Sequence, residues 1–125
     1  MKVKFTTATA RDISRVNQIY DAAFPGKDQA QDFGSLIYSN DVTVTIAELP
    51  EDGVSGMGFV MMRTIRSESE IIMLCVLPEY RREGLATLLM FDVIDKAIKL
   101  GVTSIFLEVS EDNDKAKSMY NKLGF

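Results

Sequence analysis

In the first part of the chain, the spacing of apolar residues predicts one strand and two helices. Residues 3–6 predict a short strand, and apolar side chains at helical spacing over residues 13–23 predict a helix. Thr9, with Asp12 three residues later, resembles the capping box that begins a helix. A weaker pattern around residues 33–37 predicts a short second helix.

Three runs of apolar and β-branched residues follow, and each predicts a strand. They lie at 42–49, 54–65 and 70–77, with a turn from Pro50 to Gly53 between the first two. The third run is almost continuously apolar, which favours burial on both faces of a sheet. Short polar turns between such strands are typical of an antiparallel meander.

The remainder of the chain alternates helix and strand. An apolar stripe predicts a long helix that ends near Leu100, with Gly101 just beyond its last turn. Residues 103–109 predict another strand, and residues 113–123 predict a last helix. A strand, helix, strand order implies a parallel pair with a right-handed crossover. We therefore expect an α/β (α+β) fold with a mixed, mostly antiparallel central sheet flanked by helices.

Composition and charge narrow the class of protein. The chain has 125 residues, of which 46% are hydrophobic and 26% charged, so we expect one globular domain over residues 1–125. Fourteen basic against eighteen acidic residues give a net charge of −4, which argues against general nucleic-acid binding. No apolar run is long enough to predict a membrane span.

Two residue counts limit the chemistry. The chain has no histidine, which excludes Ser-His-Asp and Cys-His catalysis and removes the commonest metal ligand. We therefore expect no metal site and a general base that is a carboxylate, a lysine, a tyrosine or water. The single cysteine, Cys75, lies in a predicted buried strand and favours a core position and a reducing, cytoplasmic setting.

The loop after the third run of the meander is a candidate anion site. It opens the long helix, whose first N–H groups would be free to bind a phosphate. Gly84 and Ala86 leave the backbone accessible, and Arg81 and Arg82 add charged donors. The alternative is an ordinary strand-to-helix loop with two solvated arginines.

Arg81-x-x-Gly84-x-Ala86 resembles the acyl-CoA pyrophosphate signature of the GNAT N-acetyltransferase superfamily. Further blocks on the predicted elements agree with it: Val76-x-Pro78-x-Tyr80-Arg81, Leu107-Glu108-Val109 and Asn113-x-x-Ala116-x-x-x-Tyr120-x-x-x-Gly124-Phe125. The resemblance is strong from residue 70 to the end of the sequence. Within the superfamily, the second half is most similar to the bacterial enzymes of the RimI type, which acetylate the N-terminal alanine of a ribosomal protein.

The resemblance also has departures. Those enzymes usually have a tryptophan where this chain has Gly26, and this chain has no tryptophan. Glu83 stands where they often carry a basic residue, and Ala86 replaces a common glycine. These departures leave the cofactor assignment in place but weaken the assignment of a peptide substrate.

The resemblance implies that acetyl-CoA is the cosubstrate and assigns residues to it. Backbone groups of Leu74, Cys75 and Val76 would hold the pantetheine and acetyl end, and the N–H of Val76 would polarise the thioester carbonyl. Asn113 would contact the cofactor or, alternatively, cap the last helix. The loop and first helical turn would hold the pyrophosphate through Arg81, Arg82, Glu83, Gly84, Leu85, Ala86 and Thr87.

Two residues are candidates for proton transfer. Glu108 lies within a strand that is otherwise apolar, where partial burial would raise its pKa toward that of a useful general base. The alternative is a solvated or lysine-paired carboxylate at a strand end. The resemblance also places Tyr120 as general acid toward the coenzyme A thiolate, although its position in an apolar stripe also fits core packing.

These observations predict direct acetyl transfer from acetyl-CoA to a primary amine. A protein N-terminal α-amine is the first choice of acceptor, and a small amine such as a polyamine, amino acid or antibiotic is the alternative. A non-catalytic acetyl-CoA-binding module is a third hypothesis. The family normally has two further strands after the last helix, so we expect a domain truncated at its C-terminus, with an open sheet edge near residues 103–109 and possible pairing with a second copy.

Overall fold

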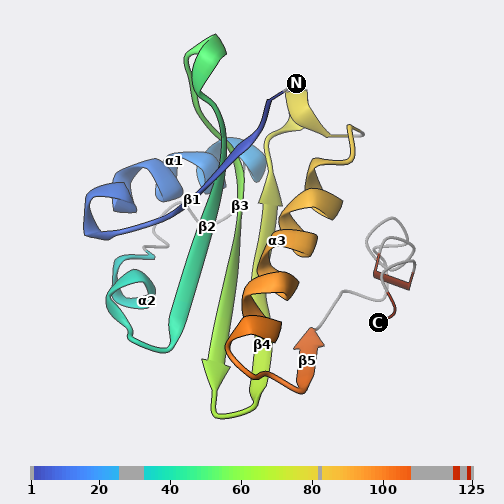
Figure 1. Cartoon of the computed structure of the whole chain (residues 1–125). Helices are drawn as coiled ribbons and strands as arrows, with labels where there is room; N and C mark the ends of the chain where they lie inside the picture. Colours follow the sequence, from blue (N-terminus) through green and yellow to red (C-terminus); the bar gives the residue numbers. More distant parts are fainter. Residues whose placement is uncertain (1, 26–32, 82, 108–119, 122–123, 125) are drawn as a thin grey trace.

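The computed structural model confirms the predicted class of fold. Over the described residues, its sheet has five strands in the order β1-β2-β3-β4-β5, antiparallel from β1 to β4 and parallel between β4 and β5 (Figure 1). The first four strands form a meander, and α3 is the crossover between β4 and β5. The structure describes residues 2–25, 33–81, 83–107, 120–121 and 124.

The elements follow the hydrophobic pattern closely. The strands are β1 (Lys4–Thr7), β2 (Val42–Leu49), β3 (Val54–Ile65), β4 (Glu68–Val76) and β5 (Ser104–Leu107). The helices are η1 (Ala10–Asp12), α1 (Ile13–Ala23), α2 (Gly34–Tyr38), η2 (Pro50–Asp52), η3 (Pro78–Tyr80) and α3 (Leu85–Lys99). The last predicted helix lies mostly outside the described residues.

The start of β4 differs from the prediction. The strand begins at Glu68, two residues earlier than expected, and the turn shrinks to two residues with Arg66 at a φ of 57°. The reason is Ser69, which lies just before the predicted strand and is 1% exposed. Its hydroxyl lies 2.7 Å from the hydroxyl of Thr64 on β3, so the polar group is hydrogen-bonded within the hairpin.

Helices cover both faces of the sheet. α1 and α2 lie on one face and α3 crosses the other (Figure 1). The core on the α1 side centres on Val16, Ile19, Tyr20, Phe33, Ile46, Phe59 and Cys75. The core on the α3 side centres on Ala47, Met57, Val60, Met62, Leu85, Leu89, Met90, Val93 and Ala97. Both cores use side chains from β2, β3 and β4, so these strands form the middle layer.

A β-bulge in β4 explains its continuous apolar run. Met61 pairs with Met73, whereas the next residue of β3 pairs with Ile71, so Ile72 is an extra residue on β4. The bulge changes which residues face which layer: Ile71 packs with the α3 side, whereas Met73 and Cys75 pack with the α1 side. The apolar run therefore contacts both cores, as predicted.

Apolar residues on β3 and at the end of α3 differ in burial. Met57, Met61 and Met62 are fully buried, because β3 has a strand on either side and helices on both faces. Leu100, near which the long helix was predicted to end, is 64% exposed because it lies at the C-cap, beyond the last turn that packs on the sheet. Gly101 follows with a φ of 85°, as expected for a helix end.

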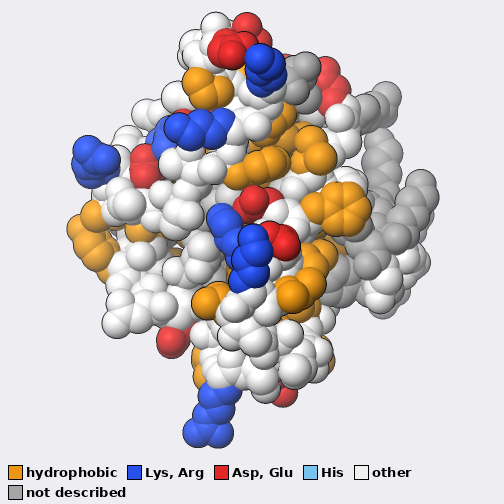
Figure 2. Space-filling model, in the orientation of Figure 1, with side chains coloured by type: hydrophobic (Ala, Val, Ile, Leu, Met, Phe, Trp, Pro, Cys, Tyr) orange, Lys and Arg blue, Asp and Glu red, His pale blue; other side chains and the backbone are white. Residues whose placement is uncertain are grey.

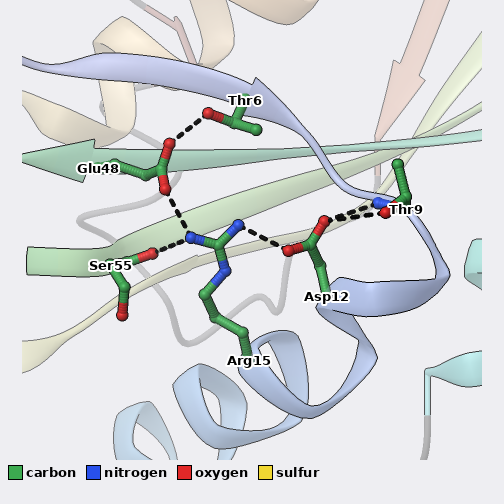
Figure 3. Close-up of polar contacts among 6 residues, drawn as sticks. All are labelled: Thr6, Thr9, Asp12, Arg15, Glu48 and Ser55. Atoms are coloured by element: carbon green, nitrogen blue, oxygen red, sulfur yellow. Dashed lines mark hydrogen bonds and ion pairs between the residues drawn. The ribbon is translucent and has the colours of Figure 1, made fainter. Parts of the chain in front are cut away.

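A network of polar side chains fixes the start of α1 on the sheet. Arg15 binds Glu48 at 2.6 Å and Asp12 at 2.8 Å, and it also donates to the carbonyl of Ser55 (Figure 3). Thr6 donates to the other oxygen of Glu48. Asp12 accepts from the backbone N–H of Thr9 at 2.8 Å, which confirms the capping box. The network joins η1 and α1 to β1, β2 and the start of β3.

The outer face of α3 is mixed in character. Leu88 is 41% and Phe91 55% exposed. In Figure 2, apolar side chains gather over this face with acidic and basic side chains among them. Lys96 anchors the helix by donating to Thr45 on β2 at 2.9 Å while it pairs with Asp92 at 3.1 Å.

None of the helices that the structure describes has the length and apolarity to cross a bilayer.

Candidate functional site

The carboxyl end of β4 presents backbone donors away from β3. Met57 and Leu77 lie opposite each other and form a hydrogen-bonded pair, with the N–H of Leu77 2.9 Å from the carbonyl of Met57. In an antiparallel pair, the hydrogen-bonded positions alternate. The N–H and C=O groups of Leu74 and Val76 therefore point to the opposite side, where β5 pairs with the first half of β4.

The residue between them behaves differently. Cys75 pairs with Phe59 of β3 at a hydrogen-bonded position, so its backbone N–H and C=O belong to the sheet. Its side chain is 1% exposed, and the thiol lies 3.9 Å from the carbonyl of Ile19. Burial raises the pKa of the Cys75 thiol to about 12. These observations confirm Cys75 as a core residue and leave Leu74 and Val76 as the outward-facing members of the predicted set.

Close contact between two strands keeps this part of the sheet in register. Gly58 lies opposite Val76, and a Cβ on Gly58 would lie 2.4 Å from the carbonyl oxygen of Cys75. Only glycine leaves room for that approach. A glycine inside a strand is typical of a close contact or a bulge. The structure shows close contact here and places the bulge of β4 elsewhere, at Ile72.

The loop after β4 is a compact turn that folds back on the strand. Pro78 begins the short helix η3, the N–H of Tyr80 binds the carbonyl of Leu77 at 3.0 Å, and the N–H of Arg81 binds the carbonyl of Pro78 at 3.3 Å. Tyr80 is partly buried against the α3-side core. The loop therefore has a defined conformation between the end of β4 and the start of α3.

Arg81 uses its side chain differently from the prediction of a phosphate ligand. Its Nε donates to the carbonyl of Val76 at 2.9 Å and its Nη2 donates to the carbonyl of Ala23 at 3.0 Å. Both acceptors are backbone atoms, one at the end of β4 and one at the end of α1. Sequence reasoning missed these contacts because nothing in the pattern of residues 76–81 shows that the loop brings the arginine back over the strand.

The beginning of α3 leaves its first N–H groups available. Gly84 is the N-cap residue with a φ of 78°, and it has no side chain that could cap the helix. The first turn of α3 contains no acidic residue, and a Cβ on Gly84 would have no atom within 4 Å. The helix runs for 15 residues, so the N–H groups of its first turn combine with its dipole to favour an anion.

The other residues assigned to this loop take different positions. Glu83 is exposed, whereas Leu85 is 1% exposed, and its side chain belongs to the core. Ala86 and Thr87 are half-buried. Leu85, Ala86 and Thr87 can therefore contribute backbone N–H groups from the first helical turn, and their contact with a cofactor stays a prediction.

The residues proposed for proton transfer are only partly described. Tyr120 is half-buried and packs against the α3-side core. Burial raises the pKa of its hydroxyl, which keeps the group protonated at neutral pH. Glu108, Asn113 and Arg82 lie outside the described residues, so their assignments stay predictions.

Together, the described groups suit an elongated ligand with an anionic portion. Leu74 and Val76 offer backbone groups along the edge of β4, and the first turn of α3 offers N–H groups for a phosphate. The described residues contain no group of three or more acidic or cysteine side chains that could hold a metal ion. The geometry therefore offers backbone hydrogen bonds to an extended ligand and N–H groups to its anionic portion.

Comparison with known proteins agrees with this geometry. The family model of the acetyltransferase (GNAT) family matches residues 13–125. A curated relative, the ribosomal protein bS18 alanine N-acetyltransferase of Escherichia coli strain K12, is 34% identical over 67 residues, which cover 54% of this chain and 45% of the relative. The chain thus spans about half the length of the curated relatives it matches. This similarity supports the predicted likeness to the RimI type.

Solved structures share the fold. The ribosomal-protein-S18-alanine N-acetyltransferase from Escherichia coli superposes with a TM-score of 0.84 at 23% identity, covering 98% of this chain and 77% of that one. AAC(6')-Iy in complex with the bisubstrate analogue CoA-S-monomethyl-acetylneamine gives 0.82 at 18% identity, covering 100% and 91%. The family match spans nearly the whole chain and agrees with the sheet, the loop and the uncapped helix. The chain belongs to the GNAT acetyltransferase family.

Proposed function

We propose that this chain transfers an acetyl group from acetyl-CoA directly to a primary amine, with a protein N-terminal α-amine as the first choice of acceptor. One observation supports this proposal: the structure combines outward-facing backbone groups at the end of β4 with an uncapped first turn of α3. The first element suits the thioester arm and the second suits the pyrophosphate. The similarity to the alanine N-acetyltransferase supports the choice of acceptor.

The reaction needs three protein contributions. The amine nitrogen attacks the thioester carbonyl carbon, a C–N bond forms, the C–S bond breaks, and the electron pair leaves with the sulfur. The Val76 N–H would stabilise the negative charge on the carbonyl oxygen. Glu108, directly or through a water, would accept the proton that the amine loses, and Tyr120 would give a proton to the thiolate. The products are the acetylated amine and coenzyme A.

Tyr120 fits the acid role by its position. Its ring packs against the same core that lies beneath Leu74 and Val76, so its position is tied to that side of β4. Burial raises the pKa of its hydroxyl, which is protonated at neutral pH as an unperturbed tyrosine also is. Since a raised pKa makes the hydroxyl a weaker acid, the position of the ring, and not the pKa, supports this role.

The test measures coenzyme A release from acetyl-CoA with short peptides and with small amines. Release with peptides that begin with Ala or Ser, reduced about 100-fold or more in Glu108→Gln, would support the acceptor and the base. Glu70→Gln is the matched control, because Glu70 is an exposed strand glutamate on neighbouring β4. Full activity of Glu108→Gln would remove Glu108 from the base role.

A small-molecule amine is the second candidate acceptor. It is favoured by the likeness in fold to AAC(6')-Iy, which was solved in complex with the bisubstrate analogue CoA-S-monomethyl-acetylneamine. Release with small amines alone would select this candidate. Tight acetyl-CoA binding with no release for any acceptor would instead support a non-catalytic binding module.

A further inference from the structure

The Arg81 side chain joins two layers of the fold at the end of β4. Nε donates to the Val76 carbonyl at 2.9 Å, and Nη2 donates to the Ala23 carbonyl at 3.0 Å. Ala23 is the last residue of α1, on one face of the sheet, and Val76 is the last residue of β4. One rigid guanidinium therefore fixes the distance between a helix end and a strand end.

The acceptor on Val76 has a particular position. Its carbonyl and its N–H both point away from β3, because Val76 and Gly58 form a non-hydrogen-bonded pair. Hydrogen bonds to β3 hold the residues on either side of Val76, because Leu77 donates to Met57 and Cys75 stands at a hydrogen-bonded position opposite Phe59. Val76 itself stands at a non-hydrogen-bonded position, and the charged donor of Arg81 binds its carbonyl on the outward side, where the N–H of the same residue also points.

The same contact changes what the edge of β4 offers to a ligand. Without Arg81, Val76 would present an acceptor next to its donor. With the carbonyl bound by Arg81, the N–H remains as the group that can bind a ligand oxygen. The guanidinium also places a positive charge near this point, where an oxygen that gains negative charge would be stabilised.

We propose that Arg81 is a positioning residue for acyl transfer, which aligns the Val76 N–H with the thioester carbonyl and does not bind the pyrophosphate. The inference rests on the proposed function. It assigns the arginine of the loop to the reacting end of the cosubstrate, whereas the pyrophosphate is left to the backbone of the first turn of α3.

Two acetyl donors separate these roles. S-acetylpantetheine keeps the thioester and the pantetheine arm but lacks the pyrophosphate. A positioning role predicts that Arg81→Met lowers kcat/KM about 10-fold or more with both donors and by a similar factor. The Kd of free coenzyme A should change less than about threefold, because the contacts to the phosphates are retained.

A pyrophosphate ligand predicts the opposite pattern. The loss would then appear with acetyl-CoA and in the Kd of coenzyme A, while turnover of S-acetylpantetheine would be unchanged. That result overturns the proposal, and so does full activity of Arg81→Met with both donors. If wild-type protein transfers acetyl to no amine, the proposed function fails instead, and the next measurement still tests the geometry.

Nuclear magnetic resonance tests the contact without turnover. The Val76 carbonyl and the Leu77 N–H form one peptide group. Loss of the hydrogen bond to this carbonyl in Arg81→Met should therefore shift the Leu77 amide signal. An unshifted Leu77 signal would overturn the proposal. Arg81→Lys keeps the charge but cannot reproduce the fork that reaches two carbonyls, so it should resemble Arg81→Met. Arg11→Met, which removes an exposed arginine on η1, is the matched control.

Discussion

Arg15 and Arg81 each join elements that lie far apart in the sequence, but they bind different kinds of partner. Arg15 pairs with the carboxylates of Asp12 and Glu48, and its side chain is 21% exposed. Arg81 is exposed and binds two backbone carbonyls. Around Arg15, opposite charges neutralise one another; at the contacts of Arg81, no counter-charge binds the guanidinium in the described part of the chain.

The two helix starts show the same difference. At η1, the Asp12 carboxylate binds the N–H of Thr9, so the start of the helical segment is satisfied from within the chain. At α3, the cap is a glycine and the first turn has no acidic residue. The comparison teaches that the network of Arg15 stabilises the fold, whereas the region of Arg81 retains positive potential for a ligand.

The largest expected effect is the loss of stability in Arg15→Met. The substitution leaves the carboxylates of Asp12 and Glu48 half-buried without their cation, which should lower the free energy of unfolding by about 3 kcal/mol. Urea unfolding measures this change. The coenzyme A Kd of the folded variant should equal that of wild type. If Arg15→Met loses no more stability than Arg81→Met, then Arg15 does not stabilise the fold more than Arg81 does, and the contrast between the two arginines is wrong.

Acid pH should weaken the same network. Burial raises the pKa of Glu48, but the hydrogen bonds from Thr6 and Arg15 outweigh it and leave the pKa lowered. The Thr9 backbone hydrogen bond lowers the pKa of Asp12. Because the folded-state pKa values lie below those of the unfolded chain, the network contributes its full stability at neutral pH. That stability is lost as the pH falls below about 4.

The measurement compares urea unfolding midpoints at neutral pH and near pH 3. Wild type should lose more stability between the two conditions than Arg15→Met, in which the carboxylates no longer gain from a bound cation. Equal losses in both proteins would show that other carboxylates cause the acid sensitivity.

A glycine substitution sharpens the comparison at α3. Gly84 and Gly53 have φ values of 78° and 71°, and a Cβ on either would have no atom within 4 Å. Alanine at either position should cost about 1 kcal/mol through backbone strain alone. Only Gly84→Ala should also raise the Kd of coenzyme A, because its Cβ would lie beside the first turn of α3. An equal Kd in both variants would place the anion elsewhere.

The smallest expected effect is that of Thr9→Ala. The strong hydrogen bond to Asp12 comes from the backbone N–H, which alanine retains, and the Thr9 hydroxyl lies 3.4 Å from the same carboxylate. Thermal unfolding should therefore show a loss of only about 0.5 kcal/mol. A loss near 2 kcal/mol would mean that the hydroxyl itself caps the helical segment.

The fold could be predicted because its signals are local. The turn from Pro50 to Gly53 and the runs on either side set β2 and β3 with the observed bounds, and the stripe over α3 has one clear apolar face. The bulge at Ile72 could not be seen, since a continuous apolar run looks the same with or without an extra residue. The early start of β4 was missed because the burial of Ser69 depends on Thr64 across the hairpin.

The candidate site divides in the same way. The accessible backbone at Gly84 could be predicted from its place before a helix, because a role of the backbone does not depend on where side chains point. Arg81 was assigned by its charge, but its hydrogen bonds depend on how the loop folds over the strand and on where α1 ends. The predicted roles of Glu108 and Asn113 depend on long-range packing; the Glu108→Gln substitution described above tests the first, and the second stays a prediction.

The burial of Cys75 has a practical consequence for measuring the proposed activity. It is the single cysteine of the chain, its side chain is 1% exposed, and its thiol pKa is about 12. Thiol reagents react with the thiolate, which is scarce and shielded at this position. A colorimetric thiol reagent added to folded protein should therefore respond to released coenzyme A and not to the protein. The proposed acetyl transfer can therefore be tested continuously, even at high protein concentration, without a cysteine-free variant.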